Sequence, residues 1–100
     1  MSAIGGLEPE QSQNIIAILK NIPGIHSAVL FGSRAKGNFS PGSDIDIAVH
    51  TQNLSIEDLQ TIHEKYDALY LPWKLDIADY THVQKKELIE HIQRVGIRLF

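Results

Sequence analysis

The sequence has 100 residues, of which 43% are hydrophobic and 21% are charged, and its formal net charge is −3. This length and composition are typical of one globular domain with a modest core, so we expect residues 1–100 to form a single domain. The negative charge disfavours binding of nucleic-acid phosphates. Because cysteine is absent, disulfides and thiolate metal sites are excluded, and any metal ligand must be oxygen or imidazole.

The N-terminal residues MSAIGGLEPEQ show no basic stretch followed by an apolar core. No apolar run approaches the roughly 20 residues that a helix needs to span a bilayer. We therefore expect a cytoplasmic protein that makes no membrane contact.

Apolar spacing in the first half of the chain predicts one helix and two strands. The helix begins at Pro9 and ends before Pro23. A short buried strand is expected at 26–31, and a helical turn begins at Gly32. The second strand, 44–50, alternates apolar and polar residues, which is typical of a strand with one buried face.

The second half predicts two further helices around a third strand. Ser55 and Asp58 form a capping pair at the start of the second helix. Its apolar stripe comprises Ile56, Leu59, Ile62, Tyr66 and Leu69.

The third strand is expected at 73–80, and Thr81 with Gln84 is expected to cap the third helix, which ends at Gly96. Residues 97–100 are a candidate edge strand. This order of elements predicts an α/β or α+β fold, a small mixed sheet of three to four strands covered by helices on one side.

Two aspartates share one face of the second strand, since Asp44 and Asp46 are two residues apart. Carboxylates that approach to about 5 Å repel by roughly 3 kcal/mol at an effective dielectric near 20, a penalty that a bound cation would remove. Asp76 has the same parity in the third strand, opposite to the apolar Leu75 and Ile77. If these strands are neighbours, the three carboxylates converge, and such oxygen ligands suit Mg²⁺ or Mn²⁺.

The D-x-D pattern alone is also typical of a solvated strand face. Ala48 and Ala78 favour a site, because small side chains on the same faces as the acids leave space beside them. Asp79 is an alternative third ligand, but its parity matches that of Leu75, which places it at the end of the strand. We therefore prefer Asp76.

The loop before the acids contains candidate phosphate contacts. The backbone amides of Gly32 and Ser33 and the Ser33 hydroxyl are suited to donate hydrogen bonds to a phosphate. Arg34 and Lys36 are candidates to neutralise it, although basic loop residues are also commonly solvated. Ser43 is either a second phosphate contact or a turn residue.

Histidine and aromatic residues yield no further site. The histidines show no metal-binding spacing, and His50, at the end of the second strand, is the nearest candidate, so we assign none. Trp73 and Tyr66 lie at apolar positions and are expected in the core or an interface.

The combination of motifs resembles a known family. Gly32-Ser33-Arg34-Ala35 with Gly37, then Ser43-Asp44-Ile45-Asp46, then Leu75-Asp76-Ile77 are similar to the nucleotidyltransferase superfamily that includes DNA polymerase beta and kanamycin nucleotidyltransferase. With 100 residues and a C-terminal RVGIRLF, the chain looks most like the minimal nucleotidyltransferases (MNT) that are paired with HEPN proteins in toxin–antitoxin modules.

The resemblance implies a polymerase beta-like nucleotidyltransferase fold and Mg²⁺-dependent transfer of a nucleoside monophosphate to a hydroxyl. It implies two Mg²⁺ ions on Asp44, Asp46 and Asp76, with Mn²⁺ as an alternative. It also implies ATP as the donor substrate and a tyrosine of the partner HEPN toxin as the acceptor, so that the protein acts as an antitoxin by adenylylation.

Two other functions stay open at this point. The chain could neutralise its partner by binding alone, or it could transfer a nucleotide to a small molecule. Larger relatives grip the base and the acceptor with an added domain, so a partner or a second copy of this chain would have to supply that surface.

Overall fold

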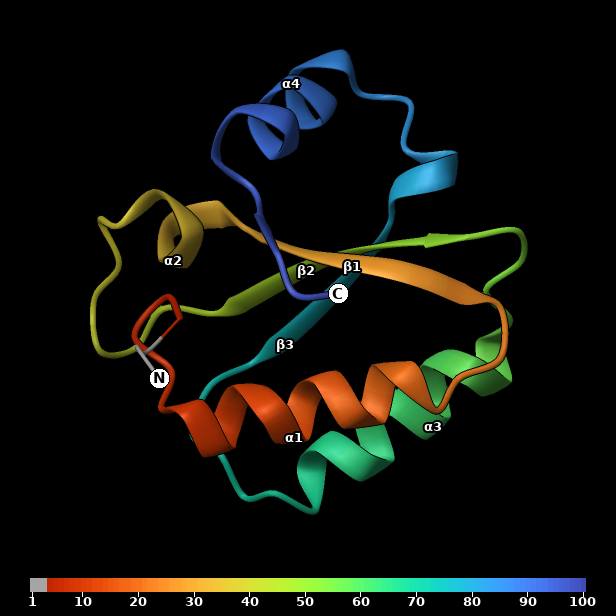
Figure 1. Ribbon diagram of the computed structural model, residues 1–100, viewed down its shortest axis with the longest axis horizontal. Coiled ribbons are helices and arrows are strands. Elements are labelled where there is room, and N and C mark those ends of the chain that lie inside the picture. The colour runs from red at the N-terminus through yellow and green to blue at the C-terminus, as the bar shows by residue number, and fades with distance from the viewer. Residues whose placement is uncertain (1–3) are drawn as a thin grey trace.

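The computed structural model describes residues 4–100. Its elements are α1 (Pro9–Lys20), β1 (Ile25–Phe31), α2 (Gly32–Lys36), β2 (Ile45–Thr51), α3 (Ile56–Asp67), β3 (Leu75–Asp79), the 3₁₀ turn η1 (Tyr80–His82), α4 (Lys86–Val95) and β4 (Ile97–Arg98) (Figure 1). The strands form an open sheet in the order β3-β2-β1-β4, with β1 antiparallel to β2 and β4, and β2 parallel to β3. The predicted mixed α/β sheet is confirmed.

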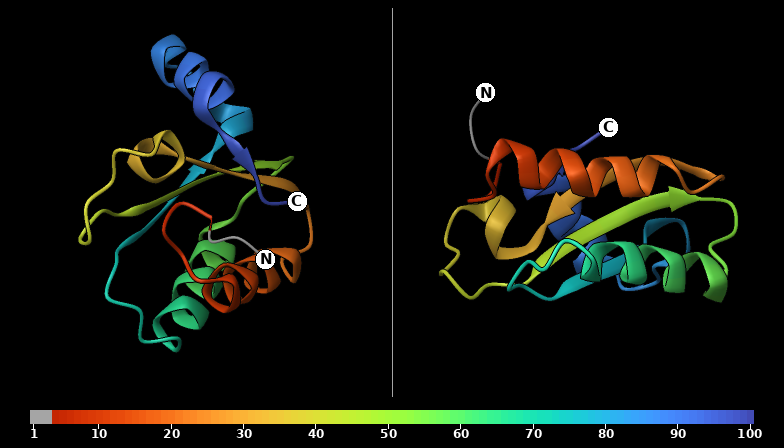
Figure 2. Two further views of the ribbon diagram at one scale, coloured as in Figure 1. Left: turned by 60° about the vertical axis from the view of Figure 1, so that its left-hand side comes forward. Right: turned by 90° about the horizontal axis from the view of Figure 1, so that it is seen from below.

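Helices cover both faces of this sheet, so the expected one-sided arrangement is wrong. Helices α1 and α3 lie side by side on one face, and α4 packs on the other (Figures 1 and 2). The alternation along β2 explains this arrangement: Ile45 and Ile47 join the core under α1 and α3, whereas Ala48 packs against α4.

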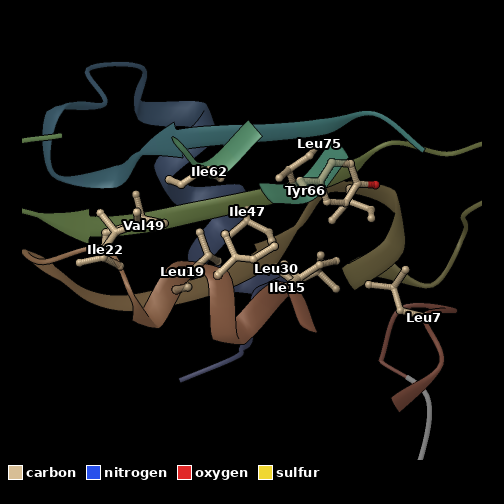
Figure 3. Packing of buried hydrophobic residues seen from close by; sticks show 14 residues of the cluster. Leu7, Ile15, Leu19, Ile22, Leu30, Ile47, Val49, Ile62, Tyr66 and Leu75 are labelled. Atoms are coloured by element: carbon tan, nitrogen blue, oxygen red, sulfur yellow. The ribbon is translucent and has the colours of Figure 1, made fainter. Parts of the chain in front are cut away.

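The main core fills the space between α1, α3 and the sheet (Figure 3). Its largest fully buried side chains are Leu19, Leu30, Ile45, Ile47, Val49 and Ile62. Burial of each such side chain stabilises the fold by about 1.5–3 kcal/mol. This core holds β2 and β3, the strands that carry the predicted site.

At the start of α3 the predicted capping pair is confirmed, but the predicted apolar stripe is wrong at its first residue. The Ser55 hydroxyl accepts a hydrogen bond of 3.0 Å from the Asp58 amide, and the Asp58 carboxylate accepts one of 3.3 Å from the Ser55 amide. Ile56 was expected on the buried stripe, but its side chain is 71% exposed. It occupies the first helical position, where α3 has not yet reached the core.

The start of α4 differs from the prediction. The helix begins at Lys86 and its N-cap is Lys85, so Thr81 and Gln84 do not cap it. Thr81 lies in η1, and its hydroxyl instead accepts a hydrogen bond of 3.2 Å from the Thr51 amide at the end of β2. The expected C-terminal edge strand is confirmed as β4. No helix within residues 4–100 is both long and apolar enough to cross a membrane.

Candidate functional site

The parallel pairing of β2 with β3 places Asp46 directly opposite Asp76. Asp44 precedes the first residue of β2 and is exposed. Burial raises the pKa of Asp46, and the charges of Asp76 and Asp44 raise it further, while His91 and Lys74 act in the opposite direction. The three predicted aspartates are therefore electrostatic neighbours at one end of the two strands.

This donor set fits a hard divalent cation. Carboxylate oxygens are the ligands that Mg²⁺ and Mn²⁺ prefer, and a cation would relieve the repulsion from Asp76 and Asp44 that adds to the effect of burial on the pKa of Asp46. Among residues 4–100, however, no group of three or more histidine, aspartate or glutamate side chains is arranged so that it could hold a metal ion. Asp76 is instead half exposed and lies 3.8 Å from the Nζ atom of Lys74.

The start of α2 lies against the Asp46 carboxylate. Gly32 has a φ of +74°, a backbone conformation that favours glycine, and a Cβ atom at this position would clash with Oδ2 of Asp46. The pairing of β1 with β2 produces this approach, since Phe31, the residue before α2, is opposite Asp46. Both the backbone conformation and the neighbouring carboxylate therefore favour glycine at this position.

The Gly32–Ser33 turn only partly matches the expected phosphate site. The Gly32 amide was expected to be free, but it donates a hydrogen bond of 3.1 Å to Nε2 of His91. The Ser33 hydroxyl forms no hydrogen bond within the part of the chain that the structure describes. Lys36 is exposed at the end of α2. Of the expected phosphate contacts at this turn, the Ser33 hydroxyl and the Ser33 amide thus have no hydrogen-bond partner among residues 4–100.

Arg34 faces the protein interior, contrary to its expected place at a phosphate. Its side chain is only 3% exposed. Nε donates a hydrogen bond of 3.1 Å to the Ser43 carbonyl, and Nη1 donates one of 2.8 Å to the Gly5 carbonyl. The guanidinium also lies over the rings of Trp73, at 4.6 Å, and Phe39, at 5.3 Å. Burial lowers the pKa of Arg34. In this structure Arg34 ties three segments together.

Ser43 has the contacts of a turn residue. Its hydroxyl accepts a hydrogen bond of 2.9 Å from the Ser40 amide, while its carbonyl is held by Arg34. The same loop is anchored to the segment before β3, because the indole of Trp73 donates a hydrogen bond of 2.7 Å to the Pro41 carbonyl. These contacts fix the stretch of chain that leads into Asp44.

Asp79 and His50 lie at the other end of the strands. Oδ2 of Asp79 is 2.7 Å from Nδ1 of His82, and the ring of His50 packs at 4.3 Å from that of Tyr80. His50 is four residues beyond Asp46 in β2, which corresponds to about 13 Å along a strand. Neither residue reaches the three aspartates.

Ala48 and Ala78 were expected to leave open space beside the acids, but they do not. Ala48 is fully buried and packs with Ile92 of α4 and with Phe31, and Ala78 packs against the same cluster. Their small side chains allow α4 to approach the sheet.

His91 is the site residue that the sequence analysis missed. It lies three residues after Leu88, on the apolar side of α4, and a polar residue at that position was the available signal. No sequence feature near His91 indicates that its side chain contacts Gly32, which is 59 residues earlier in the chain.

Residues 13–100 match the family model described as "Polymerase beta, Nucleotidyltransferase". No curated protein matches the chain. Among solved structures, a chain of a toxin–antitoxin complex with AMP-PNP is 30% identical with a TM-score of 0.73, and the match covers 89% of this chain and 72% of that chain.

A second similar structure is that of a tri-AMPylated Shewanella oneidensis HEPN toxin in complex with MNT antitoxin. It is 26% identical with a TM-score of 0.67, and the match covers 91% of this chain and 70% of that one. A putative nucleotidyltransferase from Sulfolobus solfataricus shares the fold, with 17% identity and a TM-score of 0.55, over 89% of this chain and 76% of that one.

Proposed function

Because the chain belongs to the polymerase beta nucleotidyltransferase family, we propose that it transfers AMP from ATP to a hydroxyl group of a partner HEPN toxin and thereby acts as an antitoxin. The observation that carries this proposal is the convergence of Asp46 and Asp76 beneath the Gly32–Ser33 turn. Similarity to chains of a complex with AMP-PNP and of a complex with an AMPylated HEPN toxin supports the choice of ATP and of the partner.

The proposed reaction is an in-line displacement at the α-phosphorus of the triphosphate. The hydroxyl oxygen of a toxin tyrosine forms a bond to this phosphorus, the bond to the bridging oxygen breaks, and pyrophosphate leaves. Bound Mg²⁺ ions, two in the proposal, with Mn²⁺ as a substitute, would neutralise the triphosphate and favour ionisation of the hydroxyl. Asp76, which is half exposed on the edge strand of the sheet, would help to accept the hydroxyl proton.

Each remaining residue acts by binding or by orientation. Asp44, Asp46 and Asp76 would hold the metal ions, since they are the acids that the sheet brings together. The Ser33 hydroxyl and the exposed Lys36 would contact the distal phosphates. Arg34 and Ser43 shape the loop instead of touching the nucleotide, because both are already engaged within the protein.

A labelling experiment tests this function. The protein is incubated with a HEPN toxin of the same source, Mg²⁺ and ATP labelled in the α-phosphate, beside Asp46→Asn and the matched control Asp67→Asn, an exposed acid at the end of α3. We expect label on the toxin with wild type and with the control, and a loss of about 10²-fold or more with Asp46→Asn.

Neutralisation of the toxin is measured with the same variants. If Asp46→Asn neutralises the toxin as well as wild type does, neutralisation is by binding alone and the catalytic proposal is wrong. Label on a small molecule in place of the toxin would contradict the proposed acceptor.

A further inference from the structure

A side chain from α4 completes the turn that carries Ser33. Nε2 of His91 accepts a hydrogen bond of 3.1 Å from the Gly32 amide. Nε2 therefore carries no proton, and the hydrogen bond assigns the ring proton to Nδ1. The two residues are 59 positions apart, so the contact exists only because α4 packs on the sheet face beside α2.

The sequence around α2 provides no other partner for this amide. The first amides of a helix lack intrahelical acceptors and need a cap. The residue before α2 is Phe31, which has no side-chain acceptor, and no side-chain capping bond is present there. His91 supplies the acceptor from outside the helix. It thereby restrains a glycine whose φ of +74° an L-residue would rarely adopt.

The position of His91 is itself fixed by packing. The next residue, Ile92, is buried against Ala48 and Phe31. The His91 ring meets the ring of Phe31 edge to face, with centroids 6.2 Å apart and planes at 81°. The imidazole is thus held by both its neighbour in α4 and the residue that precedes Gly32.

We propose that His91 is a positioning residue that holds the Gly32–Ser33 turn over Asp46. This inference rests on the proposed function of the site, and it assigns His91 as the residue that orients the Gly32–Ser33 turn. With the Gly32 amide bonded to His91, the Ser33 side chain projects from a restrained turn, and the Asp46 carboxylate lies against a glycine that this hydrogen bond helps to hold in place. His91 itself touches neither the phosphate nor the acceptor.

The test measures orientation separately from transfer. His91→Leu removes the acceptor, and His91→Asn has an amide too short to reach Gly32. Gln93→Leu is the matched control, since Gln93 is exposed on the same helix and its hydrogen bond goes to the Tyr80 hydroxyl. The readouts are amide hydrogen exchange at Gly32 by NMR and calorimetric binding of the Mg²⁺ complex of α,β-methylene ATP, which cannot release pyrophosphate.

We expect both His91 variants to exchange the Gly32 amide at least about tenfold faster and to bind the analogue about tenfold more weakly, the change that corresponds to ~1.4 kcal/mol. Gln93→Leu should match wild type in both readouts. Unchanged exchange and affinity in a folded His91 variant would overturn the proposal. Tighter binding would overturn it as well, because His91 would then compete with the phosphate for Gly32.

The two proposals fail in different ways. Wild type that binds the analogue with a His91-dependent affinity but transfers no AMP would contradict the proposed function and leave the role of His91 standing. Transfer that is normal in wild type and in both His91 variants would contradict the role of His91 alone.

Discussion

The Nε atom of Arg34 donates a hydrogen bond of 3.1 Å to the carbonyl oxygen of Ser43, the residue immediately before Asp44. A side chain of α2 therefore fixes the point at which the chain enters β2. The same guanidinium binds the Gly5 carbonyl, so the segment before α1 is held against the same loop. Arg34 thus links the segment before α1, 29 residues earlier in the chain, to the loop that leads into β2.

We predict that Arg34→Lys lowers the free energy of unfolding by about 2–4 kcal/mol. A lysine cannot reproduce the two directed hydrogen bonds or the stacking on Trp73 and Phe39, and it leaves a charge with fewer partners in a buried place. Urea denaturation measures the loss. The neighbouring exposed Lys36→Ala should change stability by less than about 0.5 kcal/mol. Equal midpoints for Arg34→Lys and wild type would contradict the role of Arg34.

The aspartate pair could be predicted from sequence because strand parity is local. Alternation along 44–50 and 73–80 fixed which side chains share a face, and the parallel register of β2 and β3 then places Asp46 opposite Asp76. The burial of Arg34 could not be predicted in this way. It depends on Gly5, Phe39 and Trp73, which reach Arg34 only when the whole chain has folded.

The face of the sheet on which α4 packs could not be predicted from the sequence either. A periodic apolar stripe shows that a helix packs on something, but not on which face of the sheet. Space beside the acids was inferred from Ala48 and Ala78, whereas the same small residues are what α4 requires in order to pack closely. A small residue in a strand is compatible with open space beside it and also with close packing of a helix against it.

We predict that Ala48→Leu lowers the free energy of unfolding by about 1–3 kcal/mol, because a larger side chain would overpack the contact with Ile92. Ala17→Leu is the matched control, since Ala17 is exposed on α1. The two variants are compared by chemical denaturation. If Ala48→Leu lowers the free energy of unfolding no more than Ala17→Leu does, α4 does not pack closely against Ala48.

We predict that Gly32→Ala is more damaging than Gly37→Ala, although both residues have positive φ angles, +74° and +94°. Each change imposes a left-handed backbone on alanine, at about 1–2 kcal/mol. A Cβ atom at Gly32 also meets the Asp46 carboxylate, whereas at Gly37 it meets nothing within 4 Å. The difference in unfolding free energy between the variants isolates that clash, which we expect to add about 1–3 kcal/mol. Equal losses would contradict the close approach of α2 to Asp46.

We predict that Asp46→Asn stabilises the protein at pH 7 when no divalent cation is present. Burial and the charges of Asp76 and Asp44 raise the folded-state pKa of Asp46 above the ordinary value of 3.8, so the folded state binds this proton more tightly than the unfolded state does. Stability linked to Asp46 is therefore present at low pH and is lost as the pH rises from about 3.8 through the folded-state pKa. Asparagine at this position does not ionise, so the variant does not lose this stability as the pH rises.

Thermal unfolding measures this effect, since about 1 kcal/mol corresponds to roughly 4–8 °C in Tm for a domain of this size. We expect Asp46→Asn to melt a few degrees above wild type at pH 7, and the gap to close as the pH approaches 3.8. Added Mg²⁺ should raise the Tm of wild type but not that of the variant, because a cation on the three aspartates removes the same repulsion that the substitution removes. Asp67→Asn, at an exposed acid away from the site, should leave both the pH dependence and the Mg²⁺ response unchanged. An Asp46→Asn variant that melts below wild type at pH 7 would show that the carboxylate is stabilised in the folded state, and would remove the electrostatic reason for placing a cation there.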